Sequence, residues 1–199
     1  MKKGCLLFGG IGLIVLIIIG VFWMIGSQKK MVGMDEAVHS QWSNVESAYQ
    51  KRADLVPNLV STVKGAANFE QETLTQVIEA RAKATSTTID PSNLTPEKIA
   101  QFQQAQDGLS SALSRLMVVI ERYPDLKANQ NFLNLQAELS SIESEVQFER
   151  KKFNDKAQEY NTYIRQIPTS LAARIFGFEK KGYFEAAEGS DKAPTVNFE

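Results

Sequence analysis

The sequence predicts an all-α protein: an N-terminal transmembrane helix, an antiparallel bundle of three long helices with the first kinked at Pro57, a short C-terminal helical segment and an extended tail. Three observations support this class. The chain opens with an apolar run, Cys5 to Ile25, that contains no charged residue. Apolar residues then recur at spacings of three and four, which is typical of packed helices. Strand signals are nearly absent, because no hairpin turn pair and no sustained alternation occurs.

The apolar run is long enough to cross a membrane as a helix. At about 1.5 Å per residue it spans about 31 Å, close to the hydrocarbon thickness of a bilayer. Phe22 and Trp23 lie near one end, where aromatic rings favour the interface. A cleavable signal peptide is the alternative, because Lys2 and Lys3 resemble its basic start. The run is too long for that and no A-x-A site follows it, so we expect an uncleaved anchor over residues 1–30.

The orientation of this anchor is only weakly indicated. Lys2 and Lys3 precede the apolar run, and Lys29 and Lys30 follow it, so the positive-inside rule finds almost no asymmetry. The very short basic N-terminus is typical of a signal-anchor. It favours a soluble domain outside the cytoplasm.

The long-helix bundle is predicted over residues 31–168, where three segments each carry an apolar stripe. The first stripe contains Val38, Trp42, Val45, Tyr49, Val56, Leu59 or Val60, Val63, Ala67, Leu74, Val77 and Arg81. The second contains Ile99, Phe102, Gln106, Leu109, Leu113, Leu116, Ile120 and Tyr123. The third contains Phe132, Leu135, Leu139, Ile142, Val146, Phe153, Tyr160, Ile164 and Ile167. Long helices joined by short loops lie antiparallel.

Prolines mark the breaks between these segments. In "TSTTIDPSNLTPEK", Thr95 is expected to cap the second helix and Pro96 to take its first position. Pro124 in "RYPDL" ends that helix, because the residue before a proline disfavours the helical conformation. The third helix ends at "QIPTS", residues 166–170.

Pro57 lies inside the first stripe, where a proline is unfavourable. It removes one backbone hydrogen bond and clashes with the preceding turn, at a cost of about 3 kcal/mol. The apolar register continues across it. We therefore expect either a kinked continuous helix or a near-collinear restart capped by Asp54. Packing and geometry explain this segment better than a ligand site does.

At this point the segment "KRADLVPNLVSTVKG" resembles the hallmark of the bacterial LemA family. The blocks "WSNVE", "EARAKA", "YPDLKANQNFLNLQAEL", "FNDKAQEYNTYI" and "FGF…YFE" look like that family's blocks, in the same order. One departure is Ala53, where the family often has a larger residue. The hallmark residues in these blocks are Trp42, Asn44, Asp54, Pro57, Asn58, Tyr123, Pro124, Asn131, Asn154, Asn161, Gly177 and Phe178.

The resemblance implies a single-pass protein of the bacterial cytoplasmic (inner) membrane with a helical soluble domain, and it implies no known reaction. A relative in magnetosome-forming bacteria belongs to the protein set of a membrane organelle. A membrane-organising role is therefore expected by analogy alone.

The composition excludes several classes of site. Basic and acidic residues nearly cancel, 22 against 23, so a nucleic-acid partner is not expected. The single cysteine and single histidine exclude a disulfide framework, a cysteine-based zinc site and any site that needs two imidazoles. "EAVH" has the Glu-x-x-His spacing of di-iron bundles, but no second copy exists and His39 is expected to face solvent. We predict no catalytic residue, cofactor or metal site.

Polar residues near the stripes are expected to specify helix packing. An amide near a helical seam fixes register and partner choice, which is the role expected for the hallmark asparagines. Glu149 lies near the third stripe and is placed to pair with Arg52 or Arg81.

The C-terminal part mixes apolar and basic residues. We expect residues 169–185 to fold back on the bundle, with contact to a membrane surface or another subunit as the alternative. Residues 186–199 are expected to form an extended or flexible tail, with Val196 and Phe198 as apolar anchors for a neighbour.

These observations predict a non-enzymatic, membrane-anchored helical bundle with coiled-coil-like seams that self-associates to scaffold or shape the membrane. The alternative is an accessory module that holds another membrane or envelope protein. The expected partners are membrane lipid and further copies of the chain, and in the alternative a different membrane protein.

Overall fold

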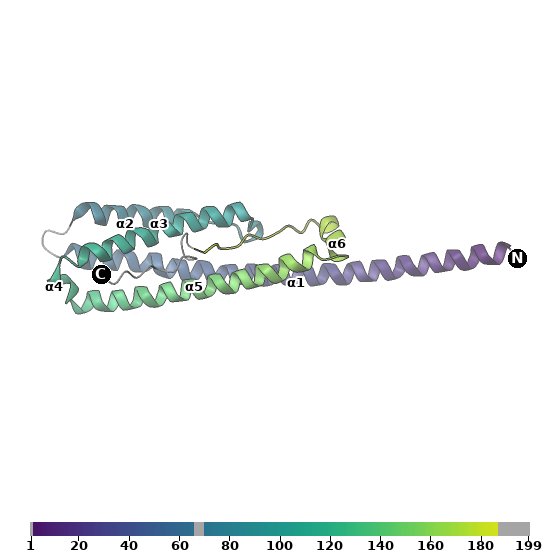
Figure 1. Cartoon of the computed structure of the whole chain (residues 1–199), viewed down its shortest axis with the longest axis horizontal. Coiled ribbons are helices and arrows are strands. Elements are labelled where there is room, and N and C mark those ends of the chain that lie inside the picture. Colours follow the sequence, from purple (N-terminus) through teal and green to yellow (C-terminus); the bar gives the residue numbers. More distant parts are fainter. Residues whose placement is uncertain (1, 66–69, 187–199) are drawn as a thin grey trace, which may run out of the picture.

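The computed structural model describes residues 2–65 and 70–186 and shows an elongated, helical molecule (Figure 1). Within these residues the chain forms six α-helices, one short 3-10 helix and no strand. Their order is α1 (Lys2–Lys64), α2 (Gln71–Ser86), η1 (Pro91–Asn93), α3 (Pro96–Ile120), α4 (Pro124–Lys127), α5 (Gln130–Arg165) and α6 (Thr169–Phe176). The predicted all-α class is confirmed.

Helices α1, α2, α3 and α5 run alternately in opposite directions along the molecule (Figure 1). Helix α1 packs mainly along α5, α2 packs along α3, and α1 also contacts α2. Helices α3 and α5 have little direct contact with each other. The space between them is therefore available to another segment of the chain.

The first predicted segment is divided into two helices. Helix α1 ends at Lys64 and α2 begins at Gln71, and α2 runs back antiparallel to α1. The bundle thus has four helices where periodicity predicts three. The apolar spacing continues across the reversal, so the stripe alone does not reveal it. Gly65, which directly follows α1, is the local signal, because glycine is common after helix ends. Ala67 of the predicted stripe lies outside the described residues.

Helix α1 is unbroken from the predicted anchor into the bundle and through Pro57. The restart capped by Asp54 therefore does not form, and Asp54 lies inside the helix. In the described part of the chain, α1 is the one helix long and apolar enough to cross a membrane. Its apolar side chains from Ile11 to Ile25 are exposed except for Met24, which is partly buried, whereas Met31 is already fully buried in the core. One helix therefore forms both the apolar span and the first helix of the bundle.

The three predicted stripes form the core. Every residue of the second stripe from Ile99 to Ile120 is buried, as are most residues of the other two. Ile167 is the exception: it is 88% exposed, because α5 ends at Arg165 and the chain turns at Pro168. The predicted helix start is confirmed, since the Thr95 hydroxyl accepts a hydrogen bond from the Lys98 backbone N–H at 3.4 Å.

The C-terminal part folds back on the bundle. Helix α6 contacts both α1 and α5. Residues 178–186, here called the strap, then run along the bundle in an extended conformation. Phe184 of the strap is buried in the core. Residues 187–199 of the predicted tail lie outside the described residues.

Candidate functional site

A single arginine connects the helices near the middle of the bundle. Arg52 of α1 is 1% exposed, and its Nη1 donates to the Ser110 hydroxyl at 2.6 Å and to the Glu143 carboxylate at 3.0 Å. Its Nη2 donates to the side chain of Gln106 at 2.8 Å and to its backbone carbonyl at 3.1 Å. Gln106 in turn donates to the Ala84 carbonyl of α2 at 3.1 Å. These contacts, here called the Arg52 network, link all four helices of the bundle.

The partner predicted for Glu149 is wrong. Glu149 accepts a hydrogen bond from Gln41 and lies 3.8 Å from Lys152, while Arg52 pairs with Glu143. Helices α1 and α5 are antiparallel, so later residues of α1 meet earlier residues of α5. Periodicity identifies the buried face of each helix but does not fix this register. The prediction that a glutamate near the third stripe pairs with Arg52 was therefore right in residue type, but the glutamate is Glu143, six residues before Glu149.

Pro57 creates a contact between α1 and α2. In a regular helix the Ala53 carbonyl accepts from the N–H of residue 57, and proline has no N–H. The Nε of Arg81 on α2 donates to this carbonyl at 2.7 Å instead. The guanidinium also lies 4.0 Å from the Asp54 carboxylate. The hallmark segment and the "EARAKA" block therefore meet at one backbone oxygen that the proline leaves free.

Two asparagines of α5 hold the strap by its backbone. Asn161 accepts from the backbone N–H of Lys181 at 2.9 Å and donates to the carbonyl of the same residue at 2.9 Å. It also donates to the Tyr183 hydroxyl at 2.9 Å. Asn154 repeats the arrangement with Phe184, at 2.9 Å to its N–H and 2.8 Å to its carbonyl. Each asparagine amide therefore forms the pair of backbone hydrogen bonds that a neighbouring strand would form in a sheet. These bonds join α5 to the strap, whereas the sequence pattern predicted that the asparagines act between helices.

Helix α3 supplies a third contact of this kind. Gln103 accepts from the backbone N–H of Glu185 at 3.0 Å and donates to its carbonyl at 3.0 Å. Arg150 of α5 donates to the same carbonyl at 2.9 Å. In the middle of the strap, a Cβ on Gly182 would lie 2.8 Å from the Cα of Pro96, so only glycine fits there. The strap therefore bridges α3 and α5, the two helices that scarcely touch.

An aromatic cluster fixes the strap to the core. The indole of Trp42 is buried, with ring centroids 5.1 Å from Phe102, 5.5 Å from Phe153 and 6.0 Å from Phe184. These rings come from α1, α3, α5 and the strap. Contacts of this size and geometry make a large part of a small core. Trp42 is thus a packing residue that all these elements share.

Charged groups fasten the start of the strap. The Nζ of Lys181 is buried and lies 2.7 Å from the Asp35 carboxylate and 3.2 Å from Nε2 of His39. His39 was predicted to face solvent, but the strap covers it in part. Burial raises the pKa of the nearby Tyr160 hydroxyl, and the charges of Asp35 and Glu179 raise it further, so this phenol stays protonated.

Two other pKa values in the bundle respond to burial. Burial raises the pKa of the Tyr49 hydroxyl, and the positive charges of Arg150 and Arg52 oppose part of this rise. Burial also raises the pKa of the Glu46 carboxyl.

The other hallmark residues lie at helix surfaces and ends. Asn44 and Asn58 are exposed on α1; Asn44 donates to Gln41, and the Asn58 carbonyl accepts from the Thr62 hydroxyl. Asn131 is exposed in the first turn of α5. Tyr123, Pro124, Gly177 and Phe178 occupy breaks between helices.

These breaks follow simple backbone rules. Tyr123 directly precedes α4, and Pro124 takes its first position, where a missing N–H costs little. Gly177 ends α6 with φ of 73°, a left-handed conformation that favours glycine. Phe178 donates its backbone N–H to the Ala173 carbonyl at 2.9 Å and packs partly against the core. These residues position the helices and the strap.

Among the described residues there is no group of three or more histidine, cysteine, aspartate or glutamate side chains that could hold a metal ion. A cleft of about 350 Å³ lies where α3 and α5 diverge beyond the strap, and Ser114, Met117, Leu139, Gln147 and Arg150 are among its lining residues. Its lining mixes apolar side chains with charged ones, because Arg52 and Glu143 of the Arg52 network, together with Asp107, also border it.

Sequence comparisons find relatives that match most of this chain. Protein LemA of Metamycoplasma hominis is 25% identical over 172 residues, which cover 85% of this chain and 75% of that protein. Magnetosome protein MamQ of Magnetospirillum gryphiswaldense is 25% identical over 179 residues, covering 80% of this chain and 65% of the relative. Magnetosome protein MamQ 2 of Paramagnetospirillum magneticum is 25% identical over 177 residues with the same coverage. The chain thus spans just under two thirds of these two magnetosome proteins.

The sequence profile of the LemA family matches residues 41–198. This range contains the Arg52 network, the contact between Pro57 and Arg81 through the Ala53 carbonyl, and the strap with the amides that hold it. The chain belongs to the LemA family.

Proposed function

We propose that this protein is a non-enzymatic, membrane-anchored helical bundle that self-associates to scaffold or shape the bacterial inner membrane. The observation that carries the proposal is the unbroken course of α1 (Figure 1). The same helix forms the apolar span and the first helix of the core, so the bundle has no flexible linker to its anchor. Because the bundle is rigidly joined to its anchor, contacts between bundles also set the spacing and tilt of the anchors in the bilayer.

Confinement to a membrane favours association between copies. Anchoring raises the effective concentration of copies without any new contact. The slender bundle also leaves large apolar side chains exposed far from the anchor, among them Val118, Phe148 and Ile78. Two relatives are named magnetosome proteins, which supports a membrane-organising role by likeness alone. The basic N-terminus supports a soluble domain on the extracytoplasmic side.

The test is the stoichiometry of the full-length chain in native membranes at low expression. Single-molecule counting and crosslinking are expected to give homo-oligomers that require the span of α1. A chain in which the apolar run is replaced by a lipid-anchored flexible linker is the control, and it should associate less. A population that stays monomeric, with no other protein bound, would contradict the proposal.

The alternative function is an accessory module that holds another membrane or envelope protein. The observation that favours it is the cleft between α3 and α5, whose lining mixes apolar side chains with hydroxyl, amide and charged groups. Extraction in mild detergent separates the two functions. A large assembly of this chain alone supports scaffolding, whereas a one-to-one complex with a different protein supports the accessory role.

A further inference from the structure

Helix α6 carries an apolar stripe that the bundle does not cover. Ile167, Leu171 and Ile175 recur every four residues and are 88%, 61% and 65% exposed. The opposite face of α6 is packed on the bundle, with Ala172 and Ala173 buried. Leu171 and Ile175, four residues apart within α6, lie on one side of this helix and form an exposed apolar ridge, while Ile167 lies in the turn directly before α6. Phe176 extends it and is also exposed.

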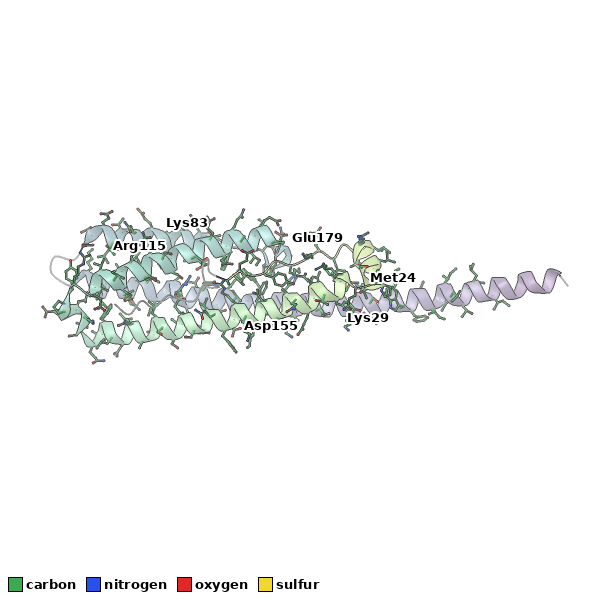
Figure 2. The ribbon with its side chains drawn as sticks, in the orientation of Figure 1. Met24, Lys29, Lys83, Arg115, Asp155 and Glu179 are labelled. Carbon is green, nitrogen blue, oxygen red and sulfur yellow. The ribbon has the colours of Figure 1, made fainter. Side chains whose placement is uncertain are left out.

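This ridge lies at the level where α1 leaves the bundle. Helix α6 contacts α1 and α5 at that end of the molecule (Figure 1). Figure 2 shows α6 beside Met24 and close to Lys29 of α1. The run of exposed apolar side chains of α1 ends at Ile25, and Ser27 is already buried, with Val32 as a single exposed large apolar residue of α1 beyond it. If α1 crosses a membrane over this apolar stretch, α6 lies at the membrane surface.

The charges around the ridge fit a lipid surface. Lys29, Arg165, Arg174 and Lys180 are exposed near it, with Glu179 as an exposed acidic neighbour. The Nζ of Lys30 lies 4.5 Å above the ring of Tyr163, at the same end of α5. Apolar residues flanked by basic and aromatic side chains are typical of helices that lie in the headgroup layer. The excess of positive charge indicates anionic lipid.

We propose that the exposed apolar surface formed by Leu171, Ile175 and Phe176 of α6 and by Ile167 in the turn before it, here called the membrane foot, inserts into the interfacial layer of the bilayer that α1 crosses. Arg165, Arg174 and Lys29 then lie among anionic headgroups, and the foot gives the bundle a second point of attachment beside its anchor. Two attachments fix the tilt of the bundle relative to the membrane, which one helix alone does not. The proposal rests on the membrane anchor of the proposed function and not on self-association.

The test uses the full-length chain with Cys5→Ser and one new cysteine, labelled with an environment-sensitive dye and reconstituted in liposomes. The foot positions are Leu171→Cys and Ile175→Cys. Lys83→Cys on α2 is the matched exposed control, and Ile18→Cys in the apolar run reports the anchor itself. We expect blue-shifted emission at positions 171, 175 and 18, quenched by lipids with brominated acyl chains, and no quenching at position 83.

The outcomes separate the foot from the anchor. Quenching at position 18 with none at positions 171 and 175 would contradict insertion of the membrane foot but support the membrane anchor. Absence of quenching at all four positions overturns both. A blue shift at 171 without bromolipid quenching shows a protein contact, such as a second copy, and overturns the lipid assignment.

The charge argument is tested in the same liposomes with and without phosphatidylglycerol. Quenching at position 171 should increase with the anionic lipid, and Arg174→Glu should remove most of that increase. Arg115→Glu, at the far end of the bundle, is the matched control and should leave it unchanged (Figure 2). Equal behaviour of the two charge variants would overturn the headgroup contact.

Discussion

At the scale of single residues, Arg52 contributes more to the bundle than any exposed ion pair does. Its guanidinium is buried and contacts α3 and α5 directly. Removing one partner of a buried pair is costly, because the other polar groups keep their desolvation cost and lose their contacts. Lys51, the neighbouring residue, pairs with Glu145 at 2.6 Å but is exposed, and exposed pairs contribute little.

We therefore predict that Arg52→Met lowers the free energy of unfolding by about 3 kcal/mol. The matched change Lys51→Met should cost less than about 1 kcal/mol. Denaturant unfolding of the detergent-solubilised chain, followed by circular dichroism, measures both. Similar small losses in the two variants would show that the Arg52 network does not hold the helices together.

The asparagines that hold the strap give a second prediction at this scale. Asn161→Ala leaves the backbone N–H and carbonyl of Lys181 without their partner, which should cost about 1–3 kcal/mol. The strap should also become more sensitive to protease, because its attachment to α5 is weakened. Asn131→Ala, at an exposed position of α5, is the control and should change neither stability nor cleavage. Equal cleavage rates in both variants would refute the assigned role.

Residue types were easier to predict from the sequence than their partners. The sequence identifies Arg52, Arg81, Asn154 and Asn161 as polar groups near buried stripes. It does not show that Arg81 takes the carbonyl left free by Pro57, or that the asparagines bind an extended segment. The partners of Arg81 and of the asparagines depend on which elements lie side by side in the fold. The periodicity of a single segment does not show which other segments it contacts.

At the scale of elements, Pro57 and Arg81 act together to attach α2 to α1, because Arg81 donates to the Ala53 carbonyl that Pro57 leaves without a partner. Pro57→Ala restores an N–H that can bond to the Ala53 carbonyl, so we expect the bundle to stay folded. Arg81→Ala should destabilise the natural chain, because it leaves that carbonyl without its partner. In the Pro57→Ala background the same change should cost about 1 kcal/mol less. A double-mutant cycle from unfolding measurements gives the difference, and strict additivity would contradict the account.

The strap is a structural element of the core. A chain ending after Ala186 should keep a cooperative thermal melt near that of the full-length protein. A chain ending after Gly177 loses Phe184 and the three amide contacts, so its melting temperature should fall clearly. Circular dichroism of both truncations measures this. Equal melting temperatures would show that the strap only rests on the surface.

The helices themselves were largely predictable, because their apolar stripes coincide with burial from Ile99 to Ile120 and from Phe132 to Ile164. The reversal between α1 and α2 was missed for a physical reason. The stripe keeps its helical register from Val63 through Ala67 to Leu74, in steps of four and seven residues, so the periodicity shows no break there. Residues 169–185 fold back on the bundle as expected, but the extended course of the strap was not predicted, because the hydrogen bonds from Asn154 and Asn161 go to backbone groups and leave no pattern in the sequence.

At the scale of the whole molecule, three features act together. The unbroken α1 joins the apolar span to the core, the strap closes the gap between α3 and α5, and α6 presents an apolar ridge beside the span. Together they describe a stiff rod whose position relative to a bilayer is set by its anchor and by the proposed foot. Such a rod is consistent with the proposed function, in which copies of the protein associate in an ordered arrangement on a membrane.

The most direct test of this account is electron cryo-microscopy of the full-length protein reconstituted in liposomes at low protein density. The account predicts clusters of rod-shaped bundles in a repeated arrangement on the bilayer, with the α6 end of each bundle at the membrane surface. Isolated single bundles that take random tilts on an unchanged bilayer would contradict the central claim of a self-associating membrane scaffold.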